Sequence, residues 1–155
     1  MDIENKKPNN KRKKTFKALL YSLSTIFVFL IVFLFAPFSD EIKRPLFLLM
    51  AILGILFLIL GAILIFFARK EKSRIGTKRN RLKLSLMITG LSAISPFVFT
   101  ILHNFFYALG MVFEKLQFIF EILHATSFII AIVVAPIIFV IGTIVSFVYL
   151  KKYNS

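Results

Sequence analysis

The sequence predicts an all-α integral membrane protein, a bundle of four membrane-spanning helices with an amphipathic interfacial helix between the third and the fourth. Three observations support this fold class. The chain of 155 residues is 59% hydrophobic, above the roughly 50% apolar content of soluble domains. Its apolar residues form long uninterrupted blocks, without the periodic polar positions of a soluble fold. Its 20 Lys and Arg residues, which give a net charge of +13, lie mainly between those blocks.

The N-terminal half predicts a tail followed by two spans. Residues 1–17, MDIENKKPNNKRKKTFK, are basic and have no apolar face, so this tail is predicted to stay largely disordered in the cytoplasm. The first span covers about 18–38 and the second about 46–68. Each is long enough to cross a hydrocarbon core of about 30 Å.

The C-terminal half predicts two further spans. A basic cytoplasmic loop, 69–83, leads into the third span, which covers 84–102 or slightly more and contains Pro96. The fourth span covers 127–150, with Pro136 inside it, and a short cytoplasmic C-terminus, 151–155, follows. Proline is tolerated within membrane helices, so neither residue argues against a span.

The outer segment 103–126 is rich in Phe but carries ionisable side chains. A fifth span here would place Glu114 and Lys115 near the bilayer centre, at about 2.5 to 3.5 kcal/mol each. We therefore predict that the third helix extends somewhat, that the chain turns near Gly110, and that an amphipathic helix lies in the outer interface. A fifth span is the alternative.

Orientation follows from the Lys and Arg residues near the ends of the spans. The tail, the central loop and the C-terminus carry 17 of them, and the opposite side carries only Lys43, Arg44 and Lys115. The positive-inside rule then predicts a multi-pass protein of the cell membrane with both termini in the cytoplasm. The basic segments lack the aromatic residues of a nucleic-acid site. Their predicted partners are the lipid bilayer and anionic lipid head groups, with no specific nucleic acid.

Motifs for catalysis are few. The chain has no cysteine, which excludes disulfides, thiolate metal sites and cysteine nucleophiles. It also lacks a phosphate-binding glycine loop, a nucleophile-elbow serine, an HExxH helix and an EF-hand loop. The leading hypothesis is a non-catalytic structural or interaction protein without a cofactor, and the alternative is a membrane-embedded enzyme or transport component.

Small residues recur at helix-packing spacing in two spans. Gly54, Gly61 and Ala68 repeat every seven residues in the second span. The fourth span has a similar face, made of Ser127, Ala131, Ala135, Gly142 and Ser146. Such faces allow close approach of backbones, either within the bundle, which we favour, or across a homo-oligomer.

A polar stripe is the candidate site of the alternative function. Its members are spaced by four and three residues in turn: His103, Tyr107, Gly110, Glu114, Gln117, Glu121 and His124. On a continuous helix they would share one face. Glu121 and His124 have the i, i+3 spacing of helical metal ligands, so His103, Glu121 and His124 are the metal candidates, with Glu114 as a further site residue. The competing interpretation is a solvated face, with His103 hydrogen-bonded to a neighbouring helix or a head group.

Overall fold

The described part of the chain is almost entirely helical. The computed structural model describes residues 10–37, 39–71 and 78–152, and no strand occurs among them. Within these ranges four helical segments are long and apolar enough to cross a bilayer: Lys11–Phe35, Arg44–Arg69, Lys78–Val112 and Glu114–Lys152. The prediction of an all-α chain with four membrane-length helices is confirmed. The predicted tail, central loop and C-terminus lie partly outside the described residues.

The first hairpin consists of α1 (Asn10–Phe35) and α2 (Asp40–Arg69). α1 begins eight residues before the predicted start at Ala18, so the prediction of disorder is wrong for the last part of the tail. Lysine and arginine are good helix formers, and Phe16 within this stretch is buried in the core. Burial of one aromatic side chain therefore anchors a turn that composition alone would leave in solvent.

The second hairpin consists of α3 (Lys78–Val112), a single 3₁₀ turn η1 (Glu114–Leu116), and then α4 (Gln117–Ile129), η2 (Ile130–Val134) and α5 (Ala135–Lys152). α3 continues ten residues past Leu102, and the chain turns at Phe113, not near Gly110. Residues 103–126 thus complete the third and fourth long helices and form no fifth span. Their position at a membrane interface stays a prediction.

α4, η2 and α5 make one continuous rod. The backbone is right-handed helical at both junctions, Ile130 and Ala135. The wider π turn of η2 ends at Val134, and Pro136 follows in the first turn of α5. Proline has no N–H to donate and its ring crowds the preceding turn, and a local π turn is one way in which a helix accommodates such a residue.

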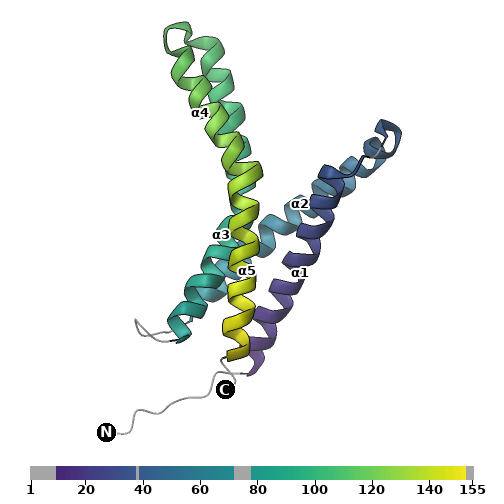
Figure 1. Ribbon diagram of the computed structural model, residues 1–155, viewed down its shortest axis with the longest axis vertical. Helices are drawn as coiled ribbons and strands as arrows, with labels where there is room; N and C mark the ends of the chain where they lie inside the picture. Colours follow the sequence, from purple (N-terminus) through teal and green to yellow (C-terminus); the bar gives the residue numbers. More distant parts are fainter. Residues whose placement is uncertain (1–9, 38, 72–77, 153–155) are drawn as a thin grey trace.

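α3 is the central helix of the molecule. It contacts α2 along one side and α4 and α5 along another, while α1 contacts mainly α2 and, less extensively, α5. The two hairpins meet at the end of the molecule where α1 starts and α5 ends, and they diverge toward the opposite end (Figure 1). The aromatic rings of Phe27, Phe57 and Phe139 fill the contact between the hairpins, with centroid separations of 4.7 and 5.1 Å about Phe139.

Glycine residues allow two close helix crossings. A Cβ atom added at Gly90 of α3 would lie 2.8 Å from the carbonyl oxygen of Gly61 in α2, and one added at Gly142 of α5 would lie 2.8 Å from Oγ1 of Thr89. Every member of the two predicted small-residue faces is buried within the chain. Packing inside the bundle is therefore confirmed for these faces, and a homo-oligomer seam through them would have to displace internal contacts.

Candidate functional site

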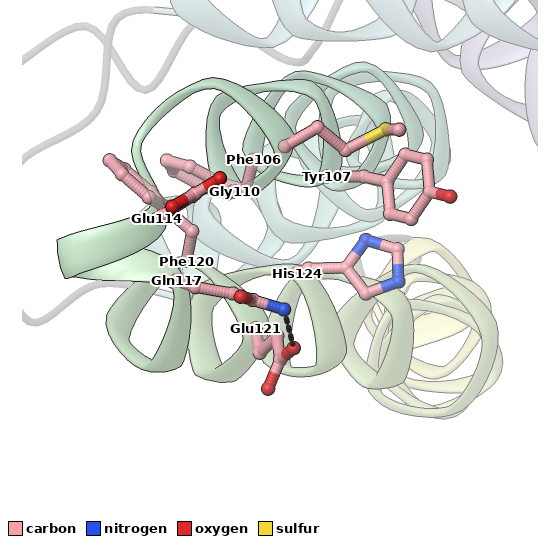
Figure 2. A pocket seen from close by; sticks show the side chains of 9 residues that line it. Phe106, Tyr107, Gly110, Glu114, Gln117, Phe120, Glu121 and His124 are labelled. Carbon is pink, nitrogen blue, oxygen red and sulfur yellow. Dashed lines mark hydrogen bonds between the residues drawn. The ribbon is translucent and has the colours of Figure 1, made fainter.

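The predicted polar stripe is folded in two by the turn at Phe113. His103, Tyr107 and Gly110 lie on α3, whereas Gln117, Glu121 and His124 lie on α4. The stripe therefore does not lie on one continuous helix, yet its members still converge. α3 and α4 pack against each other, and the two halves of the stripe face one another at the end of the hairpin (Figure 2).

The two histidines form a reciprocal clasp between α3 and α4. Nδ1 of His103 lies 3.1 Å from the carbonyl oxygen of His124, and Nδ1 of His124 lies 3.0 Å from the carbonyl oxygen of His103. A carbonyl oxygen can only accept, so each Nδ1 carries the hydrogen and donates it. The imidazole rings stack with their centroids 3.7 Å apart. The expectation that His103 bonds a neighbouring helix is confirmed.

Further aromatic rings extend this stack on both sides. The Phe128 ring lies 5.3 Å from that of His103, and the Tyr107 ring lies 5.4 Å from that of His124. Aromatic contacts at such distances are worth about 0.5 to 1.5 kcal/mol beyond the burial of area. The clasp and its flanking rings thus hold α3 and α4 in register just below the end of the hairpin.

A pocket of about 270 Å³ lies beyond the clasp, at the end of the hairpin (Figure 2). It is lined by Phe106, Tyr107, Gly110, Met111, Glu114, Gln117, Phe120, Glu121 and His124. Six of the seven stripe residues are in this list, and only His103 is not. The sequence pattern therefore identified most of the polar lining, but the aromatic rings of Phe106 and Phe120 and the thioether of Met111 were missed. An apolar residue at a pocket looks the same in sequence as one that faces lipid.

The polar groups of the pocket are mostly acceptors. The carboxylate of Glu121 accepts a hydrogen bond from Nε2 of Gln117 at 2.9 Å (Figure 2), which leaves the amide oxygen of Gln117 free to accept. With its Nδ1 donating to His103, a neutral His124 presents an acceptor at Nε2. Neither Glu114 nor Glu121 has an ion-pair partner among the described residues. The pocket is accordingly an electronegative cavity with aromatic walls.

The three metal candidates come together only in part. His103 and His124 are in contact, and Glu121 shares the pocket with His124. In the described ranges, however, no three histidine, aspartate or glutamate side chains are grouped closely enough to hold a metal ion. Both Nδ1 atoms are already occupied by backbone carbonyls.

The clasp gives a first prediction. In a double-mutant cycle of His103→Ala and His124→Ala, the two losses in free energy of unfolding should be non-additive by about 0.5 to 1.5 kcal/mol, because the two imidazole rings stack on each other. Unfolding is followed by circular dichroism in detergent. Phe105→Ala is a matched control, since its half-exposed ring lies on the same stretch of α3. Additive effects of the histidine changes would contradict the stacking of the two rings.

A second polar cluster, at the opposite end of the molecule, was missed by the sequence pattern. Glu71 follows α2 and is buried, with 6% of its surface exposed. Its Oε1 accepts a hydrogen bond from Nε of Arg79 in α3 at 2.6 Å, and its Oε2 lies 3.4 Å from a terminal nitrogen of Arg12 in α1. In the sequence Glu71 is one acidic residue within a basic loop, so only the fold shows that it joins three helices.

No protein-family model, no curated protein and no solved structure matches the chain.

Proposed function

We propose that this chain is a multi-pass protein of the cell membrane that acts by binding, without catalysis, through the pocket at the end of the α3–α4 hairpin. The observation that carries the proposal is the pocket itself. Five polar side chains from α3, η1 and α4 line one cavity of about 270 Å³, close to the lower limit of common ligand sites: Tyr107, Glu114, Gln117, Glu121 and His124. The remaining helix surface offers large apolar side chains, as expected for contact with lipid.

The distribution of charge supports an orientation with both termini in the cytoplasm. Most of the Lys and Arg residues in the described ranges lie at one end of the molecule, called the basic end. It consists of the start of α1, the end of α2, the start of α3 and the end of α5. The start of α1 and the end of α5 lie at this same end of the molecule (Figure 1). The positive-inside rule assigns it to the cytoplasm. Each basic side chain near anionic head groups would add about 1 kcal/mol of attraction.

Helix lengths support a position of the pocket outside the hydrocarbon core. At a rise of roughly 1.5 Å per residue, the 35 residues of α3 extend about 52 Å. A hydrocarbon core of about 30 Å needs only some 20 of those residues. Counted from Lys83 at the basic end, an upright α3 would leave the core near His103. The clasp would then lie at the outer boundary, with the pocket beyond it among the head groups or in water.

Single-cysteine labelling tests this arrangement. Because the chain has no native cysteine, each introduced thiol reports without background. Val112→Cys and Phe118→Cys, both at exposed positions of the hairpin, should react with a membrane-impermeant maleimide in intact cells. Lys14→Cys and Lys78→Cys, at exposed positions of the basic end, should react only after the cells are permeabilised. Equal labelling of Val112→Cys and Lys78→Cys in intact cells would overturn the orientation.

A further inference from the structure

We propose that the ligand of the α3–α4 pocket is an organic ammonium group. This inference rests on the proposed function for its choice of pocket, but not on the orientation of the chain in the membrane. The pocket offers a cation two things at once. It has two carboxylates, Glu114 and Glu121, and it has the aromatic rings of Phe106, Tyr107 and Phe120.

The charge of the lining selects a cation. No lysine or arginine is among the described residues that line the pocket, and neither carboxylate has an ion-pair partner in the described part of the chain. The main side-chain N–H donors, those of Gln117 and His124, are already directed at Glu121 and at a backbone carbonyl. An anionic ligand would meet like charge with few free donors. An ammonium ligand would meet carboxylate, amide and imidazole acceptors.

The aromatic walls favour an organic cation over a metal ion. The face of an aromatic ring attracts a cation within about 6 Å of its centroid, and aromatic cages that hold quaternary ammonium groups use this attraction. Met111, which also lines the pocket, adds a soft apolar surface that suits N-methyl or methylene groups. A metal ion would need several converging ligand atoms, and no such group of three is present in the described part of the chain.

Two sources could supply such a group. One is a free amine, such as choline or an alkylated ammonium ion in solution. The other is the choline or ethanolamine head group of a phospholipid, which lies at the depth where the proposed orientation places the pocket. Both present the same ammonium chemistry, and the test separates them.

The test uses the full chain, purified in detergent and titrated with choline chloride or tetramethylammonium chloride by calorimetry. Wild type should bind both saturably. The double variant Glu114→Gln/Glu121→Gln should bind about tenfold more weakly or worse, because the Coulombic attraction of both carboxylates for the cation is lost. Phe120→Leu should weaken binding about two- to fivefold through loss of one ring face. Glu41→Gln is the matched control, since it removes an exposed carboxylate of α2 that does not line the pocket.

Repeating the choline titration in lipid nanodiscs identifies the source of the ammonium group. If a free amine is the ligand, choline should bind wild type equally in phosphatidylcholine and phosphatidylglycerol discs. This comparison is made after the choline binding of the double variant in the same discs has been subtracted. If the lipid head group is the ligand, added choline should bind more weakly in phosphatidylcholine discs, where the pocket is already occupied. Either result supports the ammonium inference.

Three results would overturn it. These are equal binding by wild type and the double variant, displacement of choline by sodium chloride at equal concentration, and no saturable binding in detergent or in phosphatidylglycerol discs. Both glutamates are exposed, so the double variant should keep its helical content and melting temperature, which circular dichroism checks. Failure of the cysteine-labelling result would reject only the orientation, whereas failure of choline binding with labelling as expected would reject only the ligand.

Discussion

Replacing Gly90 by alanine should lower the free energy of unfolding by about 1 to 3 kcal/mol, the range found when extra methyl groups are forced into packed interiors. The added Cβ would lie 2.6 Å from Cγ1 of Ile65 and 2.8 Å from the carbonyl oxygen of Gly61. A side chain can change rotamer, but the Gly61 carbonyl belongs to the backbone of α2. The α2–α3 crossing itself must therefore widen, which would disturb the main contact between the two hairpins.

The expected loss remains after the opposing propensity effect is included. Alanine in a helix interior is favoured over glycine by about 0.8 to 1 kcal/mol, so the steric cost at Gly90 has to exceed this gain. Gly110→Ala on the same helix isolates the gain, because its Cβ would meet only Cβ of Phe120, at an ordinary 3.5 Å. Gly110→Ala should leave stability unchanged or raise it slightly.

Thermal and detergent-induced unfolding, followed by circular dichroism at the helical band, would measure both variants. Gly61→Ala, whose Cβ would lie 2.9 Å from that of Ala93, should resemble Gly90→Ala. Equal stability of the Gly90 and Gly110 variants would show that the α2–α3 crossing is not as close as the structure has it.

The sequence predicted those parts of the molecule that depend on local composition. Four membrane-length helices follow from the apolar blocks, and the buried faces follow from small residues at seven- and four-residue spacing. Each of these two signals is read within a single segment of the chain, so neither requires knowledge of which helices are neighbours. The same reasoning located the polar stripe, because a period of three and four residues marks one helix face wherever that face points.

The parts that depend on tertiary contact were not predictable. The four- and three-residue spacing of the stripe continues through the turn at Phe113, so the pattern itself gave no sign that the chain reverses there. Only the packing of α4 on α3 converts one stripe into two facing halves. Similarly, Gly110 looked like a turn residue, yet it lies inside α3, where the approach of Phe120 leaves room for a side chain.

Glu71→Gln should also destabilise the chain measurably, and it tests the basic end. The carboxylate is buried beside two guanidinium groups, and hydrogen bonds to charged partners contribute about 1.5 to 3 kcal/mol when they are well enclosed. The arginine side chains are 55% and 33% exposed for Arg12 and Arg79. Solvent screening reduces the value of such pairs, so we expect a loss of about 1 to 2 kcal/mol in the free energy of unfolding.

The two arginines should not contribute equally. Arg79 is the less exposed and donates from Nε at 2.6 Å, whereas Arg12 lies 3.4 Å away and is more than half exposed. Arg79→Gln should therefore destabilise more than Arg12→Gln, and only Arg79→Gln should show strong coupling to Glu71→Gln in a double-mutant cycle. Glu41→Gln, which changes an exposed carboxylate of α2, is the control for the change in net charge.

The salt dependence of these losses, and the sign of the arginine effects, distinguish a structural ion cluster from a general reduction of positive charge at the basic end. If Glu71 only reduced the net positive charge there, the loss on Glu71→Gln would vanish at high salt, because charges more than about 10 Å apart are screened at 0.1 M. Removing either arginine would then stabilise the chain by relieving repulsion. If Glu71 instead joins α1, α2 and α3 by direct hydrogen bonds, most of the loss should persist in 0.5 M salt, and both arginine variants should be less stable than wild type.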